Sequence, residues 1–190
     1  YKELLNFCTV DLSAFYFDIR KDCLYCDPLD SEKRKATIVL LNIILNSLIK
    51  WFAPILSFTT EEIYRLLFKN NKSVHLEKFL VFPDIFKNEK LNDKWNELIK
   101  IRNICNISIE EKRASKEIGS SLEAELKINL NKKLQNITNN IDFSELCITS
   151  KADVVYVKES DVMVETKKMQ GKKCSVCWKI NPETCIRHPE

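Results

Sequence analysis

The strongest chemical signal in the sequence is a pair of cysteines, Cys174 and Cys177, separated by two residues and followed by Trp178. Two thiolates at this spacing can both reach one tetrahedral zinc ion, at bond lengths of about 2.3 Å. Cys185 and His188 follow and offer a second ligand pair, although the stretch between the pairs is shorter than is usual for a zinc ribbon. The pattern favours zinc binding, and free or redox-active thiols are the alternative.

A second Cys-x-x-Cys, Cys23 and Cys26, has no partner pair nearby in the sequence. Asp22 and Asp27 flank it, and neighbouring carboxylates raise rather than lower the pKa of a thiol. We therefore interpret these cysteines as structural. His75 lies between two apolar residues with no nucleophile motif around it, which favours a core or surface role.

No catalytic residues are predicted. Residues 168–172 read Lys-Met-Gln-Gly-Lys and superficially resemble the ATP-loop signature of class I synthetases, but the third and fourth residues do not match that signature and the segment runs directly into the cysteines. The chain has only two glycines, which could hardly supply a phosphate-binding loop. Neither a Ser-His-Asp set nor a carboxylate pair with a motif around it is present.

Composition indicates a cytoplasmic protein with a true core. The 190 residues are 45% hydrophobic and include eight cysteines without any secretory feature, so reduced thiols are expected. The longest apolar run, residues 38–49, is interrupted by Asn42 and Asn46 and is too short to cross a bilayer, so no membrane partner is predicted.

The net charge is only +3, so any nucleic-acid contact must come from local basic clusters. The clusters are residues 33–35, 167–168 and 172–173. Taken alone, each is more simply a solvated face.

Apolar spacings of three and four predict helices in the first part of the chain. One runs from Lys2 to about Ile19, and a second, capped by Asp30 or Ser31, runs to Phe52 and is apolar nearly all round, as suits a helix surrounded by others. A capping box from Thr59 to Glu62, with a staple between Phe58 and Ile63, predicts a third helix reaching Phe68 and a turn at residues 70–71.

Residues 73–86 read as a crossing loop, followed by a long helix with Leu91, Trp95, Leu98, Arg102 and Cys105 on one side. Gly119 is expected to end that helix in a left-handed cap. Alternation over residues 122–130 and β-branched runs at 154–157 and 162–164 predict a small sheet, and residues 134–146 have interrupted helical spacing. The predicted fold is mainly α: a helical bundle over residues 1–86, a long helix and small α+β subdomain over 87–168, and an incomplete zinc knuckle over 169–190.

Several segments, in order, resemble the C-terminal region of bacterial-type isoleucyl-tRNA synthetase. They are residues 10–16 with 21–27, residues 53–64, residues 111–113 with 118–124, and residues 173–178. Together they span nearly the whole chain. Position 23 departs from the family's motif, which usually has Arg where this chain has Cys.

The resemblance implies a tRNA-anticodon-binding helical domain of an enzyme that joins isoleucine to its tRNA using ATP. Catalytic, ATP-binding and editing residues of that family lie outside this chain, and a second Cys-x-x-Cys of the family would begin just past Glu190, leaving Cys174 and Cys177 as the zinc ligands here. The implied partner is isoleucine tRNA, bound by a monomer, with no DNA partner. The residues expected to contact RNA are Lys33, Arg34, Lys172, Lys173, Trp178 and Lys179.

Two other functions are compatible with the residues alone. One is a free-standing zinc-binding adaptor that docks on a protein, which predicts a complete metal site within the chain. The other is a helical structural module with no ligand.

Overall fold

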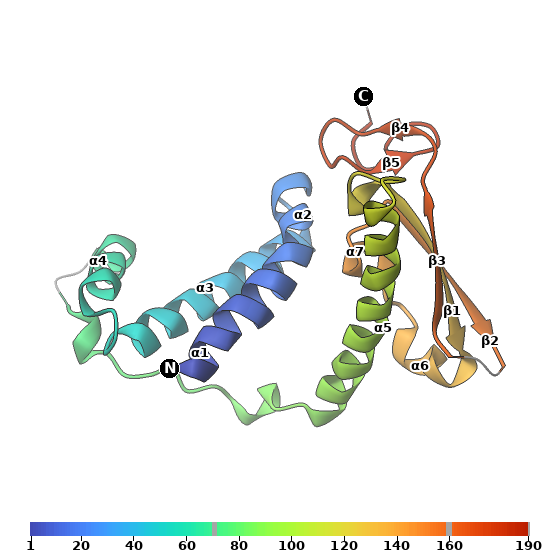
Figure 1. Ribbon diagram of the computed structural model, residues 1–190. Coiled ribbons are helices and arrows are strands. Elements are labelled where there is room, and N and C mark those ends of the chain that lie inside the picture. Colours follow the sequence, from blue (N-terminus) through green and yellow to red (C-terminus); the bar gives the residue numbers. More distant parts are fainter. Residues whose placement is uncertain (70–71, 159–160, 190) are drawn as a thin grey trace. The chain divides into compact units, whose positions relative to one another are not determined.

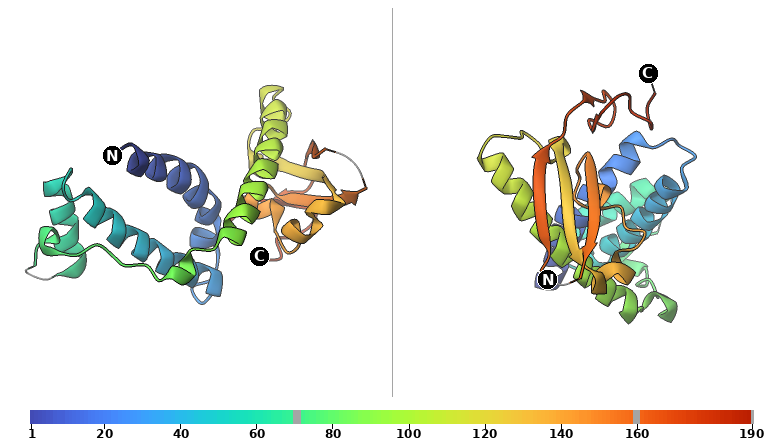
Figure 2. Two further views of the ribbon diagram at one scale, coloured as in Figure 1. Left: turned by 90° about the horizontal axis from the view of Figure 1, so that it is seen from below. Right: turned by 90° about the vertical axis from the view of Figure 1, so that its right-hand side faces the viewer.

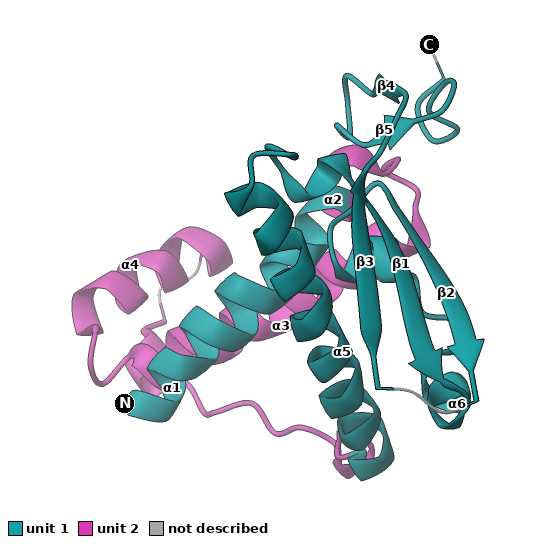
Figure 3. Cartoon of the chain, turned by 45° about the vertical axis from the view of Figure 1, so that its right-hand side comes forward, with its two compact units in different colours: residues 1–22, 88–190 teal, residues 23–87 magenta. Residues whose placement is uncertain are grey.

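The computed structural model describes residues 1–69, 72–158 and 161–189 (Figure 1). The chain divides into two compact units (Figure 3). Unit 1 contains Tyr1–Asp22 and Asn88–Glu190, and unit 2 contains Cys23–Lys87. The mainly helical fold with a small α+β region confirms the predicted class, whereas domain boundaries at residues 86 and 168 stay a prediction.

The first helical arm is longer than predicted. It consists of α1 (Lys2–Asn6), η1 (Phe7–Phe17) and α2 (Asp18–Cys26), and η1 is π-helical. A π-helix has wider i→i+5 turns and is rare beyond a single turn. The predicted apolar face is still buried at Leu12 and Ile19. Ile19 belongs to the core of unit 1, and Phe15 packs edge-on against Trp95 there, with ring centroids 6.1 Å apart.

The long helix α5 (Glu89–Ala114) begins at Asn88, whose side chain accepts a hydrogen bond from the Leu91 N–H at 3.0 Å. It buries Leu98, Ile101, Cys105 and Ile109 at helical spacing. The prediction that Gly119 caps the C-terminal end of this helix is wrong. The helix ends earlier, because Lys116 takes the left-handed conformation (φ 61°) and the next N–H, that of residue 117, returns to the Lys112 carbonyl, which satisfies the helix end.

A three-stranded sheet packs against α5 (Figure 2). Its strands are β1 (Ala124–Asn131), β2 (Lys151–Val157) and β3 (Met163–Lys168), in the order β2-β1-β3. The central strand β1 is parallel to β2 and antiparallel to β3, so that Ile128 lies opposite both Val154 and Val164. The predicted alternation is confirmed, since alternate residues of β1 are fully buried: Ala124, Leu126, Ile128 and Leu130.

Short helical turns connect these elements. They are η4 (Ser121–Glu123), η5 (Lys132–Leu134), α6 (Gln135–Thr138) and α7 (Phe143–Leu146). Asp142 caps α7 by accepting the N–H groups of Ser144 and Glu145. Phe143 and Leu146 thereby enter the core of unit 1.

Unit 2 is helical, with α3 (Glu32–Phe52), α4 (Ser57–Phe68) and the 3₁₀ turns η2 (Val74–Leu76) and η3 (Asp84–Phe86). Ser31 caps α3, as predicted. The small core of this unit consists of Ile49, Ala53, Tyr64 and Val74.

The start of α4 differs from the prediction. The helix begins at Ser57, so Thr59 lies within it rather than at its cap, and no capping box forms. Phe58 is 92% exposed and forms no staple with Ile63. Instead the Glu61 carboxylate accepts hydrogen bonds from the Ser73 hydroxyl and the Val74 N–H at 2.8 and 2.9 Å, which holds η2 against α4. Helix α4 ends at Phe68 as predicted, and the predicted turn at residues 70–71 lies outside the described residues.

The prediction that other helices surround α3 is wrong, because Ile38, Val39 and Leu40 are exposed. This helix is long and apolar enough to cross a membrane. Core helices of soluble proteins can have the same length and composition, so these two properties do not distinguish the two kinds of helix. The apolar run at residues 38–49 is predicted to be too short to cross a bilayer. The helix that contains this run has 21 residues, so the length argument does not apply to the whole helix.

Candidate metal centre and basic surface

The cysteines lie on a small hairpin formed by β4 (Lys172–Lys173) and β5 (Ile180–Asn181), and residues 171–189 are called the cysteine module below. Gly171 has φ +141° and approaches β5 so closely that a Cβ atom there would lie 2.1 Å from the Asn181 carbonyl oxygen. Only glycine fits this position. The segment at residues 168–172 is thus a strand end followed by a tight turn into β4.

A tight turn brings the first two sulfur atoms inward. The Cys174 N–H donates to the Lys179 carbonyl at 2.9 Å and the Trp178 N–H donates to the Cys174 carbonyl at 3.1 Å. Trp178 takes a left-handed conformation with φ 63°, which is unusual for a bulky residue. Both Cys174 and Cys177 are buried as a result.

Four donor atoms converge, since those of Cys174, Cys177, Cys185 and His188 all lie within 4.8 Å of one another. The Cys177 and Cys185 sulfur atoms are 3.8 Å apart, and His188 Nδ1 is 3.6 Å from both the Cys174 and the Cys185 sulfur. A tetrahedral ion with metal–sulfur bonds of about 2.3 Å has sulfur–sulfur edges of about 3.8 Å. The set fits a tetrahedral metal ion.

The surroundings of the sulfur atoms differ in what they do to the thiols. Hydrogen bonds from the backbone N–H groups of Cys177 and Val176 lower the pKa of Cys174 to about 6. Burial raises the pKa of Cys177 to about 12. Burial also opposes ionisation of Cys185, but hydrogen bonds from the His188 backbone and ring outweigh it and lower the pKa of that thiol. Backbone N–H groups directed at sulfur favour thiolates, the form that binds metals.

The donor chemistry selects among metals. Three sulfur atoms and one imidazole suit zinc, whereas magnesium and calcium prefer oxygen ligands. A hollow of about 50 Å³ lies against three of the donors, those of Cys174, Cys185 and His188. Within the described residues this is the one such cluster of His, Cys and acidic groups. Cys23 is buried, with its sulfur 3.7 Å from the Thr37 hydroxyl, in agreement with a structural role.

Four of the six predicted RNA-contacting residues surround the metal cluster. Lys172 and Lys173 are exposed on β4, Trp178 is 60% exposed, and Lys179 is partly buried beside it. The Lys173 ammonium lies 5.6 Å from the centroid of the Trp178 ring. This is a cation–π contact, and it places a positive charge next to an exposed aromatic face.

The other two predicted residues, Lys33 and Arg34, belong to unit 2, at the start of α3. Lys33 is exposed, whereas the Arg34 guanidinium donates to the Asp27 carbonyl at 2.7 Å. Arg34 therefore braces the turn between α2 and α3.

Polar contacts join the cysteine module to the rest of unit 1 at Ile180 and at Arg187. The Ile180 N–H donates to the Ser150 hydroxyl at 2.6 Å, and the Arg187 guanidinium pairs with the Asp22 carboxylate at 2.7 Å. Sequence reasoning missed both, because each joins residues far apart in the chain and neither belongs to a motif.

Comparison with known proteins identifies the family. Residues 1–128 match the family described as the anticodon-binding domain of tRNA ligase. The chain belongs to this family. It is also 65% identical, over all of its residues, to an isoleucine–tRNA ligase of Pelagibacter ubique (strain HTCC1062), of which it covers 21%.

Further relatives carry the same name. The chain is 38% identical to an isoleucine–tRNA ligase of Agrobacterium fabrum and 40% identical to one of Bartonella henselae, in each case over 96% of the chain and 20% of the relative. The chain thus spans about a fifth of the length of the curated relatives that it matches. These similarities confirm the resemblance to isoleucyl-tRNA synthetase.

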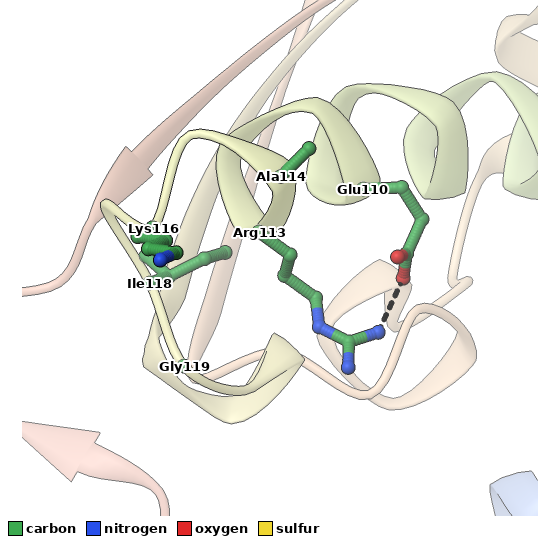
Figure 4. A pocket seen from close by; sticks show the side chains of 6 residues that line it. All are labelled: Glu110, Arg113, Ala114, Lys116, Ile118 and Gly119. Carbon is green, nitrogen blue, oxygen red and sulfur yellow. Dashed lines mark hydrogen bonds and ion pairs between the residues drawn. The ribbon is translucent and has the colours of Figure 1, made fainter.

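A larger hollow in this anticodon-binding family member lies at the end of α5, with a volume of about 480 Å³ (Figure 4). Glu110, Arg113 and Lys116 are among its lining residues. The Arg113 guanidinium already pairs with Glu110 at 2.6 Å, so two of its charges neutralise each other. Among the described residues, the one cluster of potential metal-binding side chains lies in the cysteine module instead.

Proposed function

We propose that this chain recognises the anticodon arm of isoleucine tRNA as part of a cytoplasmic, monomeric isoleucyl-tRNA synthetase, which attaches isoleucine to its tRNA using ATP. The observation that carries the proposal is the match of residues 1–128 to the anticodon-binding domain family, together with 65% identity to an isoleucine–tRNA ligase over the whole chain. The catalytic and editing steps belong to parts of the enzyme outside this sequence.

The basic surface of the cysteine module suits single-stranded RNA. Anticodon bases can be splayed out of their stack, and proteins bind such bases on aromatic planes while lysines hold the phosphates. Trp178 offers an exposed ring, the Lys173 ammonium lies 5.6 Å from its centroid, and Lys172 and Lys179 belong to the same hairpin segment. We assign base stacking to Trp178 and phosphate contacts to the three lysines.

On unit 2, Lys33 and Arg34 are the proposed contacts. Lys33 is exposed at the first turn of α3, where helix N–H groups also favour phosphate oxygens. The guanidinium of Arg34 already donates to the Asp27 carbonyl. Arg34 therefore contributes positive charge near the RNA rather than a two-pronged hydrogen bond to a phosphate.

Zinc is the proposed cofactor, held by Cys174, Cys177, Cys185 and His188. This set includes the two ligands expected from sequence and the second pair that the sequence left as an option. The distances among the donors support a complete tetrahedral set within the chain. Zinc in such a closed site is structural, and it would fix the turn that carries Lys173 and Trp178.

Chemical footprinting of isoleucine tRNA tests the proposal. We expect the chain to protect the anticodon loop and to leave the acceptor end reactive. Trp178→Ala should reduce the protection, whereas Val176→Ala, a change at an exposed position on the same turn, should not. Protection of the acceptor end instead of the anticodon loop would refute the assignment.

A further inference from the structure

Arg187 lies between two of the four metal donors, Cys185 and His188, and reaches across to helix α2. Its guanidinium donates to the Asp22 carboxylate at 2.7 Å and to the Asp22 backbone carbonyl at 3.4 Å. Both side chains are largely buried, with 29% and 27% exposed. The contact joins residues 165 positions apart within unit 1.

The loop that carries Arg187 has little regular structure. The neighbouring Ile186 is 96% exposed, so it anchors nothing in a core. The loop contains no helix or strand after β5 among the described residues, and its turn is closed by a backbone bond from the His188 N–H to the Cys185 carbonyl at 3.2 Å. Binding of both flanking donors to one ion would fix this turn and, with it, the position of Arg187.

Three residues of α2, at alternate positions, form ion pairs with other elements of the described chain. Asp18 faces Arg102 of α5 at 3.9 Å, Arg20 pairs with Glu145 of α7 at 2.8 Å, and Asp22 pairs with Arg187 at 2.7 Å. The first two pairs tie α2 to the body of unit 1. The third involves the metal-binding loop, so it should respond to metal while the Arg20–Glu145 pair should not.

We propose that Arg187 is a metal-dependent latch: ion binding at the cysteine cluster holds Arg187 on Asp22 and so fixes the cysteine module against α2. The inference rests on the proposed zinc site. The same module carries Lys172, Lys173 and Trp178, so the latch sets where the RNA-contacting surface lies with respect to the helical arm.

Hydrogen exchange of the full chain, read by mass spectrometry with zinc loaded or removed by a chelator, tests the latch. In the wild type, zinc removal should speed exchange of the amides around residue 22 by about threefold to fivefold, as expected for the loss of one partly buried ion pair. Asp22→Asn should exchange at the faster rate in both states while still binding one zinc. Glu145→Gln, which breaks the Arg20 pair on the same helix, should retain the response to zinc.

The outcomes separate the latch from the metal site. A wild type that binds one zinc but shows no change around residue 22 would overturn the latch and leave the zinc site standing. An unchanged zinc response in Asp22→Asn would also overturn it. Failure of the wild type to bind zinc would contradict the proposed site, and the latch with it. Combining Asp22→Arg with Arg187→Asp should restore the zinc response that either single variant lacks, provided that metal content is equal.

Discussion

The sulfur atoms of Cys177 and Cys185 lie 3.8 Å apart, although one belongs to the hairpin turn and the other to the loop after β5. This separation equals the edge expected between two thiolates on one tetrahedral zinc ion, about 3.8 Å. The relationship joins the two halves of the candidate site and is the reason that Cys185 is included among the proposed metal ligands.

Cys185→Ser should lower zinc retention. A closed structural site needs four protein ligands, so losing one thiolate should reduce the zinc that remains after dialysis against a chelator from one ion per chain to a small fraction. Cys26→Ser, in the Cys23–Cys26 pair near the start of the chain, is the matched control and should retain the ion. Metal analysis of the dialysed proteins gives the result. Equal retention by Cys185→Ser would favour Cys174 and Cys177 as the only ligands in this chain.

Gly171→Ala should loosen the cysteine module. A Cβ atom there meets the Asn181 carbonyl at 2.1 Å on a backbone with φ +141°, so we expect the β4–β5 pairing to lose about 2 kcal/mol or more. Gly119→Ala is the control, because its Cβ would lie at an ordinary 3.5 Å from the nearest atom, a Glu123 carboxylate oxygen. Hydrogen exchange of the β4 and β5 amides measures the difference. Equal exchange in the two variants would contradict the strain argument.

Local patterns predicted most of the fold, because the spacing of apolar residues within each element matches the period of a helix or of a strand. The alternation of residues 124–130 gave the central strand, and Ser31 gave the start of α3. The errors fell at helix ends, where several neighbouring residues can each serve as the cap. Helix α4 begins at Ser57, before the capping box predicted at Thr59. At the end of α5, Lys116 has the left-handed conformation that was expected at Gly119.

Leu98→Ala should destabilise unit 1. Leu98 of α5 is fully buried in the core that also contains the central strand, so its truncation should reduce the free energy of unfolding by about 2–5 kcal/mol through reduced burial and a cavity. Leu91→Ala on the same helix is the control, because Leu91 is exposed and should cost less than about 1 kcal/mol. Urea denaturation of both variants provides the comparison, and similar decreases would argue against the packing of α5.

Acid should weaken the contact between α4 and η2. The hydrogen bond from Ser73, with that from the Val74 N–H, holds the pKa of Glu61 below its ordinary 4.5 despite some desolvation. A lowered folded-state pKa means that the stabilisation is present above pH 4.5 and disappears as the pH falls through the lowered value.

Glu61→Gln should remove this part of the acid sensitivity of unit 2. Glu62→Gln, at the neighbouring exposed position, should leave it in place. Urea denaturation of both variants and the wild type from about pH 7 to pH 3 checks the difference. Identical pH profiles for Glu61→Gln and the wild type would show that the carboxylate plays no such role.

The candidate site was only partly predictable. The Cys174 and Cys177 spacing indicated a metal, but no spacing rule could choose between Cys185 with His188 and ligands beyond the chain, because that choice depends on how the loop folds back. The Arg187–Asp22 pair had no signal at all, since it joins two segments that only tertiary packing brings together.

Binding of fluorescently labelled RNA pieces by the purified chain tests the central claim most directly. The pieces are the anticodon stem-loop and the acceptor-stem minihelix of isoleucine tRNA. We expect saturable, salt-sensitive binding of the stem-loop, weakened by Trp178→Ala. Its salt dependence should fall in slope by about 0.7 for each single-strand phosphate that Lys172→Ala or Lys173→Ala no longer neutralises. The minihelix should bind more weakly by at least about tenfold. Equal or tighter binding of the minihelix would contradict the assignment of this chain to the anticodon arm.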